Sequence, residues 1–366
     1  MDSNFNILHL SSPLSWRGGE QQLSYLHAGL LARGYNSKVF CPNEGVLASK
    51  LTVEERVLYN KRSGFDVFAA YKLAKYCHAN PVDIIHAHDA HAHTTSVLAA
   101  LLFRNKTPIV LSRRVDFAIG NSRFSRYKYN HKNIRVIACV SDAIKAMVEP
   151  KISNKAIEVT TIHSGVDLTR FEQVNPIDLR TEMSLEPSIK LVANFSALAD
   201  HKDYFTFIDT AALVCASRKD VRFLIFGKGE LETDLKAYTK EKGLEKQVLF
   251  VGFRQNLPDI YPNIDILLFT SKTEGLGTTV LDAFAAKVPV VATKAGGVPE
   301  MVIHEKTGLL TEVGDANMLA ENVIQVLDNK TLSKQLTERA FEKCQDFSVD
   351  HMVNQTENWY KKVLNI

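Results

Sequence analysis

Two carboxylates, Glu274 and Asp282, lie eight residues apart on either side of a glycine turn. The pattern predicts that a strand ends before Glu274 and that a helix begins after Gly277, with unpaired backbone N–H groups at residues 278–280. Such N–H groups and the positive end of the helix dipole together form an anion site. Carboxylates accept hydrogen bonds from neighbouring hydroxyl groups. The segment therefore predicts a ligand that joins a phosphate to a hydroxyl-rich group, as a nucleotide sugar does.

The elements that would position these residues alternate between strands and helices. Short apolar strands are expected at residues 7–10, 38–40, 84–86 and 109–111, and a second series at 191–193, 223–226, 248–251, 266–269 and 288–291. Helical patterns separate them, which indicates parallel strands joined by crossover helices. The sequence thus predicts an α/β fold of two doubly wound, Rossmann-like domains with a boundary near residues 162–167. Because ligands of such sheets lie beyond the carboxyl ends of the strands, we expect a site in the interdomain cleft.

The composition and length of the chain agree with the prediction of two domains. The chain has 366 residues, of which 45% are hydrophobic and 23% charged, as in an ordinary globular enzyme. Five cysteines without a CxxC pair indicate reduced thiols in the cytoplasm. We expect neither a signal peptide nor a membrane span, since no basic cluster precedes the first strand and no long apolar run occurs. The net charge of +3 is too small to argue for nucleic acid as a partner.

Positive charge is concentrated in residues 112–135. The cations there are Arg113, Arg114, Arg123, Arg126, Lys128, Lys132 and Arg135, with aromatic residues between them and Asp116 as the acid. One interpretation is a solvated loop and helix face. The other is a surface that binds an anionic acceptor or an anionic membrane, where each basic residue contributes about 1 kcal/mol.

Several motifs, taken in their order along the chain, resemble one known family. The most specific are the acids at 274 and 282, followed by Pro289, the glycines at 296 and 297, and the pair Pro299 and Glu300. Supporting motifs lie at residues 18–20, 82–88, 140–141, 162–167 and 251–253. Together they resemble the retaining glycosyltransferases of family 4 over nearly the whole chain. The resemblance implies a GT-B fold, in which two Rossmann-like domains face each other across a cleft.

The resemblance also implies a division of labour. Residues 166–349 would bind the nucleotide-sugar donor, and residues 1–165 with the last helix at 350–366 would bind the acceptor. The implied reaction moves a hexose-type sugar from a UDP- or GDP-sugar to a hydroxyl of a glycan or lipid-linked acceptor, with no cofactor and no metal ion. The implied setting is bacterial lipopolysaccharide or surface polysaccharide synthesis, in the cytoplasm or peripherally on the inner face of the cytoplasmic membrane.

Residue roles follow from the same resemblance. Glu274 would bind hydroxyls of the transferred sugar, Asp282 the ribose hydroxyls, and Lys202 the diphosphate, while His88 and Arg114 would lie near the reacting sugar. The other expected donor contacts are Gly18, Gly19, Phe253, Arg254, Gly277, Thr278 and Thr279, and the expected acceptor contacts are Arg113, Arg114, Arg123 and Arg126. For each of these residues, an ordinary packing or surface role is the alternative.

Three positions depart from the family pattern. The family usually has glutamate in place of Asp282, so the ribose contact is expected to be looser or water-mediated. Residues 195–198 lack an arginine that many members carry a few residues before Lys202. Arg114 stands where many members have a histidine, and arginine cannot act as a base near neutral pH. It could instead bind an acidic or phosphorylated acceptor.

Four histidines within residues 86–93 could suggest a metal site. However, the expected turn from strand to helix sends alternate residues in different directions, and no cysteine or further carboxylate cluster accompanies them. We therefore expect no metal ion. His88 is expected in the cleft, and His91 and His93 on the surface at the start of a helix.

Other functions fit the same sequence. One is a GT-B sugar-nucleotide epimerase or a soluble transferase that acts on a small acceptor. Another is a non-catalytic nucleotide-sugar-binding protein, which the missing arginine and Asp282 would allow. Donor binding without turnover on any acceptor would support the last of these.

Overall fold

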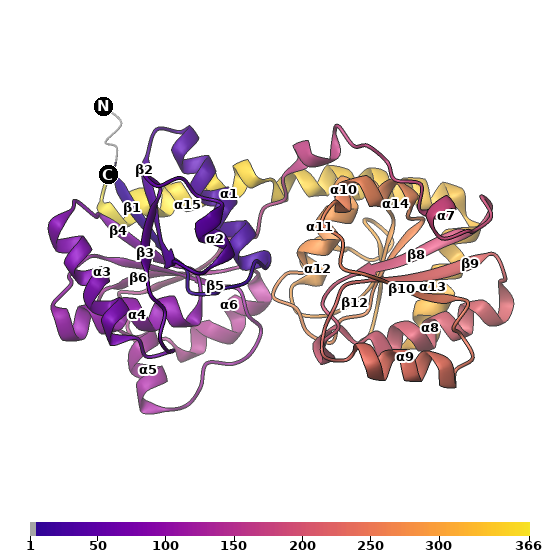
Figure 1. Ribbon diagram of the computed structural model, residues 1–366, viewed down its shortest axis with the longest axis horizontal. Helices are drawn as coiled ribbons and strands as arrows, with labels where there is room; N and C mark the ends of the chain where they lie inside the picture. Colours follow the sequence, from indigo (N-terminus) through magenta and orange to yellow (C-terminus); the bar gives the residue numbers. More distant parts are fainter. Residues whose placement is uncertain (1–4) are drawn as a thin grey trace. The chain divides into compact units, whose positions relative to one another are not determined.

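The computed structural model describes residues 5–366 and divides the chain into two compact units. Unit 1 comprises the chain up to Gly165 together with Val349–Ile366, and unit 2 comprises Val166–Ser348. The sequence-based division places the second boundary one residue later. Figure 1 shows that each unit is a sheet covered by helices. The predicted class of two Rossmann-like α/β folds is confirmed.

Unit 1 is built on a parallel sheet. Its strands are β1 Asn6–Leu10, β2 Asn36–Pro42, β3 Arg56–Tyr59, β4 Ile84–Ala87, β5 Ile109–Arg113, β6 Ile134–Cys139 and β7 Glu158–Thr161. They lie in the order β3-β2-β1-β4-β5-β6-β7. Its helices are α1 Gly18–Ala32, α2 Val46–Ser49, α3 Val67–Ala79, α4 Ala90–Phe103, α5 Arg123–Tyr129, α6 Asp142–Val148, the 3-10 helix η1 Glu149–Lys151 and α15 Val349–Leu364. The central strands β1, β4 and β5 are mostly apolar because helices cover both faces of the sheet, and they also contain buried polar residues such as His9, His86 and Ser112.

The last helix, α15, belongs to unit 1 although it follows unit 2 in the sequence. Met352, Val353 and Tyr360 are buried in the same core as Ile84 and Val110 of the sheet. At Gly29 of α1, an added Cβ would lie 2.6 Å from a methyl group of Val353, so the two helices are in close contact there. This contact fixes α15 on the amino-terminal sheet.

Unit 2 contains the second parallel sheet. Its strands are β8 Lys190–Phe195, β9 Val221–Phe226, β10 Val248–Gly252, β11 Ile266–Phe269, β12 Val290–Thr293 and β13 Leu309–Thr311, in the order β10-β9-β8-β11-β12-β13. Its longer helices are α8 Tyr204–Ser217, α9 Glu232–Glu241, α11 Thr278–Ala285, α13 Ala316–Asp328 and α14 Lys330–Cys344. Its short helices are η2 Leu168–Phe171, α7 Leu179–Glu182, η3 Asp200–Lys202, α10 Leu257–Ile260, η4 Tyr261–Asn263, α12 Val298–Met301 and η5 Gln345–Phe347.

Differences from the expected strands have local causes. The strand expected at 288–291 begins at Val290, after Pro289, which has no N–H to donate to a neighbouring strand. β3, β6, β7 and β13 were not predicted. β3 and β7 are edge strands whose side chains are mostly half-buried, so their apolar pattern is weak.

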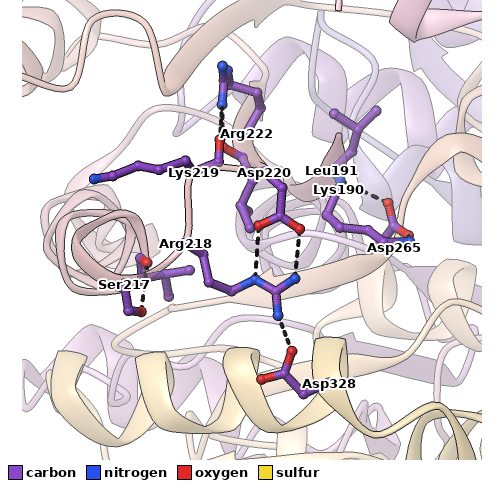
Figure 2. A network of polar contacts seen from close by, with 11 residues as sticks. Lys190, Leu191, Ser217, Arg218, Lys219, Asp220, Arg222, Asp265 and Asp328 are labelled. Carbon is purple, nitrogen blue, oxygen red and sulfur yellow. Dashed lines mark hydrogen bonds and ion pairs between the residues drawn. The ribbon is translucent and has the colours of Figure 1, made fainter. Parts of the chain in front are cut away.

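A polar network lies at the amino ends of the strands in unit 2 (Figure 2). The Arg218 guanidinium donates to both carboxylate oxygens of Asp220, at 3.1 and 2.7 Å, and also pairs with Asp328 at the end of α13. Asp265, directly before β11, pairs with Lys190 at the start of β8, 2.9 Å away. Ligands of a parallel sheet bind at the opposite, carboxyl ends. These charges therefore join strands and helices and are not candidates for the functional site.

Candidate functional site

Two of the predicted catalytic residues meet in unit 2. Lys202, at the end of η3, forms an ion pair with Oε1 of Glu274 in the loop after β11. The Ser271 hydroxyl donates to the same oxygen at 2.7 Å. Both charged side chains are largely buried, with 17% of the Lys202 and 10% of the Glu274 side chain exposed. The carboxylate is therefore held in one orientation before any ligand is present.

The two glycines after β12, Gly296 and Gly297, pack against the backbone of Glu274. Gly296 has a φ of +50°, and an added Cβ would lie only 1.8 Å from the carbonyl oxygen of Glu274. Gly297 N donates to that same oxygen at 3.4 Å. The Thr293 hydroxyl donates to the carbonyl of Ser271 at 2.6 Å. Glycine is required at 296 because the backbone of the Glu274 loop leaves no room for a side chain.

Helix α11 begins beside this loop without a side-chain cap. Its N-cap is Gly277, with a φ of +91°, and no side chain caps the helix. The backbone N–H groups of Thr278 and Thr279 lie at the start of the helix, where no intrahelical carbonyl is in place to accept from them. They remain available to an anion. The expectation of a third free amide is wrong, because Val280 N donates to the carbonyl of Gly277 at 2.9 Å. The Thr279 hydroxyl donates to Phe195 at the end of β8, at 3.1 Å, which fixes the start of α11 against the sheet.

Asp282 lies one turn into α11 and is half-buried. Burial raises the pKa of its carboxyl to about 6, and the positive charge of Arg170 opposes this rise. Tyr261 and Cys344 are close enough for the Asp282 charge to raise their pKa values further. The Asp282 carboxyl thus lies in a poorly hydrated environment. Its contact with a ribose remains a prediction.

A pocket of about 400 Å³ lies at the carboxyl ends of β8, β9 and β10. Its lining comprises Phe195, Ser196, Ala197, Phe226, Gly227, Lys228, Phe253, Arg254 and Leu257. The rings of Phe195 and Phe226 stack 4.5 Å apart at an angle of 18°. Phe253 and Arg254 were expected here. Lys228 was not, although its position directly after an apolar strand and a glycine is a signal that could have found it.

In unit 1, Gly18 and Gly19 form the first turn of α1. A Cβ added to either glycine would meet no atom within 4 Å, so packing does not require glycine at these positions. Glu20 in the same turn accepts a hydrogen bond from Arg17 N at 3.0 Å, and burial raises the pKa of its carboxyl. The open space above the two glycines would let a ligand approach the backbone.

His88 links the buried side chain of His9 to the half-buried side chain of Arg114. Arg114 Nη1 lies 3.1 Å from His88 Nδ1, and His88 Nε2 lies 2.9 Å from His9 Nδ1. Because arginine can only donate, Nδ1 of His88 accepts and its Nε2 carries the hydrogen that it donates to His9. Burial lowers the pKa of both histidines well below the usual range. Both nitrogens of His88 are thus occupied, which suits an orienting role better than that of a free base.

The nitrogens of His9, His86 and His88 lie within 4.8 Å of one another, as metal ligands would. However, His86 Nε2 bonds the Ser112 hydroxyl at 2.8 Å and its Nδ1 bonds Tyr360 of α15. A cation would have to displace these hydrogen bonds and those of His88, next to the Arg114 guanidinium. The arrangement favours neutral, hydrogen-bonded histidines over a metal centre.

The other two histidines of this run differ from each other. His91 is exposed, as expected. The expectation for His93 is wrong, because it is fully buried and its Nε2 contacts the carbonyl of Lys128 at 3.1 Å. His93 belongs to the continuous buried stretch of α4 from Ala92 to Ala99, which packs inside unit 1.

The basic segment divides into buried and exposed cations. Arg113 is 5% exposed and donates to the Tyr129 hydroxyl at 3.1 Å and to the carbonyl of Phe117. Lys128 is also buried, which lowers its pKa to about 8. Arg123 and Arg126 of α5 are exposed. The position of Arg113 thus suits a structural role, whereas Arg123 and Arg126 are free to meet a ligand.

Comparisons with known proteins agree with the fold and the motifs. A family model described as "Glycosyl transferases group 1" matches residues 182–343, and one described as "Glycosyltransferase Family 4" matches residues 16–170. N-acetyl-alpha-D-glucosaminyl L-malate synthase from Bacillus anthracis is 27% identical, over 97% of this chain and 92% of that protein. UDP-Gal:alpha-D-GlcNAc-diphosphoundecaprenol alpha-1,3-galactosyltransferase from Escherichia coli is 25% identical, over 73% of this chain and 71% of that protein.

A solved structure has the same fold. The crystal structure of Anabaena HepE in complex with UDP-glucose aligns with a TM-score of 0.83, over 98% of this chain and 100% of that chain. The two sequences are 22% identical, so this likeness concerns the fold.

Proposed function

The chain belongs to the group 1 and family 4 glycosyltransferases and has their GT-B fold. From its site we propose that it catalyses the following sugar transfer. It moves a hexose-type sugar from a UDP- or GDP-sugar to a hydroxyl of a glycan or lipid-linked acceptor. The anomeric configuration is retained and no metal ion takes part. The observation that carries the proposal is the pairing of Lys202 with Glu274 beside the uncapped start of α11.

Unit 2 supplies groups that suit a nucleotide-sugar donor. Glu274 offers a carboxylate to sugar hydroxyls, and Lys202 offers positive charge to the diphosphate. The amides of Thr278 and Thr279 add the positive end of the α11 dipole. The aromatic pocket at the ends of β8 to β10 suits a planar nucleobase. The fold shared with the UDP-glucose complex of the Anabaena protein further supports such a donor.

The proposed reaction needs no nucleophile from the enzyme. The acceptor oxygen bonds to the anomeric carbon on the face from which the diphosphate departs, and the departing phosphate oxygen takes the acceptor's proton. Catalysis then depends on orientation and on stabilising the negative charge of the leaving diphosphate. Lys202 and the α11 amides can provide that stabilisation as fixed positive charge, and Glu274 keeps the Lys202 ammonium in place.

Exposed side chains of unit 1 favour the proposal that the acceptor lies at an anionic membrane. Arg123 and Arg126 are exposed on α5, and Phe117 and Tyr127 nearby in the sequence are 62% and 49% exposed. Cations combined with exposed aromatic rings suit the surface of an anionic bilayer. The Escherichia coli relative is named for transfer to a diphosphoundecaprenol-linked sugar, which supports an acceptor of this class in bacterial glycan synthesis. No helix in the described part of the chain is long and apolar enough to cross a membrane.

A second candidate is transfer to a small carboxylate acceptor. Arg114 is held by His88, and its Nε is buried without a partner among residues 5–366. An unsatisfied guanidinium nitrogen suits an incoming carboxylate. The Bacillus anthracis relative, which aligns over nearly the whole chain, is named for a product that contains L-malate.

Release of UDP or GDP from a panel of sugar nucleotides tests both candidates. We expect turnover with a polyprenyl-diphosphate-linked sugar for the first and with L-malate for the second. The anomeric proton coupling of the product tests retention, and an inverted product would contradict it. Activity lost in EDTA and restored by a divalent cation would contradict metal independence.

A further inference from the structure

The lining of the donor pocket in unit 2 contains two cations, Arg254 and Lys228, which differ in whether an ion pair already occupies them. Arg254 forms an ion pair with Glu182 of α7. Lys228 is exposed on the pocket rim and has no ion pair within 4 Å among residues 5–366. Lys202, nearer to α11, is already paired with Glu274. Lys228 is therefore the cation at this pocket that is free to meet a negative charge.

The backbone around Lys228 is fixed against the loop after β8. Gly227 has a φ of +148°, and an added Cβ would lie 1.9 Å from the carbonyl oxygen of Ser196. Leu198 N donates to the carbonyl of Lys228 at 3.1 Å, and Leu231 N donates back to Leu198 at 3.2 Å. The start of the Lys228 side chain is thus held beside residues 196–198, while its end is free to move.

Two further features describe the surroundings of this side chain in the pocket. Gly252, at the end of β10, has a φ of +80°, and Cε of Lys228 would lie 4.0 Å from a Cβ added there. The floor of the pocket is formed by the stacked rings of Phe195 and Phe226. A ligand that fits both features has a planar aromatic part and a negatively charged part.

We infer that Lys228 binds the phosphate groups of a nucleoside diphosphate whose base occupies this pocket. The inference rests on the proposed function, because it presupposes a nucleotide-sugar donor. Lysine suits this task as a point charge at the end of a flexible side chain, and it needs no planar partner. Residues 195–198 themselves carry no cation, and the bond between the Lys228 carbonyl and Leu198 N holds the Lys228 backbone beside them, so that its flexible side chain can supply one.

Titration calorimetry with UDP and GDP tests the inference on the full-length chain. We expect Lys228→Ala to weaken binding of the nucleoside diphosphate roughly ten- to hundredfold, as for loss of a hydrogen bond to a charged group. Lys228→Arg should keep most of the affinity. Lys246→Ala is the matched control, because Lys246 is an exposed lysine of the same unit that precedes β10 and so lies at the amino ends of the strands, away from the pocket.

The nucleoside alone separates phosphate recognition from base recognition. Uridine or guanosine, measured by NMR titration, should bind wild type and Lys228→Ala equally well. A similar loss for nucleoside and nucleotide would overturn the phosphate role, and so would UDP or GDP binding within twofold of wild type in Lys228→Ala. Wild type that binds neither nucleotide would instead contradict the proposed function. Thermal melting of each variant verifies that it is folded.

Discussion

Lys202 and Glu274 form an ion pair although 72 residues separate them in the sequence. Lys202 follows strand β8 and Glu274 follows strand β11, and these strands are neighbours in the sheet of unit 2. The pair brings a cation and a carboxylate to the carboxyl edge of the sheet, where parallel sheets bind their ligands. Because both side chains are largely buried, removing one leaves the other charge unpaired.

The close approach of Gly296 to Glu274 predicts the effect of a single methyl group. Gly296→Ala should lower the free energy of unfolding by about 1–3 kcal/mol and abolish most of the transfer activity, because the Cβ would displace the Glu274 backbone. Gly314→Ala is the control, since its φ of +82° is equally unfavourable but no atom lies within 4 Å. Chemical denaturation and product release measure the two effects. Equal losses in both variants would show that backbone strain alone is responsible.

Asp282 predicts a pH dependence of stability. Its carboxyl has a pKa of about 6 in the folded chain, above the ordinary value of 3.8. Between these values the folded state binds more protons than the unfolded state, so stability decreases as the pH rises towards 6. Asp282→Asn should remove this decrease and stabilise the protein at pH 7 by up to about 3 kcal/mol.

Urea denaturation of Asp282→Asn at pH 4.5 and 7 measures this difference. Asp234→Asn serves as the control, because Asp234 is exposed on α9. The same pH slope in wild type and Asp282→Asn would mean that Asp282 is not the group that titrates.

Arg114 is predicted to act on the acceptor and not on the donor. Arg114→Ala should raise the acceptor KM roughly tenfold or more and leave nucleotide affinity unchanged, because Arg114 belongs to unit 1, whereas Lys202 and the α11 amides that would bind the diphosphate belong to unit 2. Arg135→Ala provides a control with the same loss of charge at an exposed position of β6. Initial rates with varied acceptor test the prediction, which fails if the acceptor KM is unchanged.

The exposed cations of α5 predict binding to anionic vesicles. Reversing both Arg123 and Arg126 to glutamate should weaken sedimentation with phosphatidylglycerol vesicles at least tenfold, since each cation near the surface contributes about 1 kcal/mol. Reversing Lys240 and Lys246, which are exposed in unit 2, is the control. Wild type that fails to sediment with these vesicles would contradict the membrane proposal and favour the small acceptor.

Regular patterns made much of the fold predictable. The central strands β1, β4, β8, β9 and β11 were found because burial on both faces makes most of their residues apolar. Edge strands β3 and β7 lack that signal. The expected second domain boundary differs by one residue from the division between Ser348 and Val349, a difference usual at helix ends, where residues make few contacts.

The site was less predictable because its contacts join distant segments. The glycine turn before α11 predicts an anion site from local sequence alone. That the N–H group of Val280 donates to the carbonyl of Gly277 can be seen only in the backbone geometry. Likewise, Arg113 and His93 look like surface groups in a polar stretch, and they are buried because Tyr129 and the Lys128 carbonyl provide partners. The link from Arg114 through His88 to His9 joins three neighbouring strands, β5, β4 and β1, and could not be seen in any one of them.

The most direct test of the central claim is the thermal shift produced by UDP, GDP and their sugars on wild type, Lys202→Ala and Glu274→Ala. We expect one nucleotide sugar to raise the Tm of wild type by several degrees at about 100 times its Kd. Lys202→Ala should reduce the shift with nucleotide and nucleotide sugar alike, whereas Glu274→Ala, which also frees Lys202, should reduce the shift with the nucleotide sugar more than the shift with the nucleotide alone. Shifts that are the same in all three proteins, or no shift in wild type, would contradict the assignment of this ion pair to the donor site.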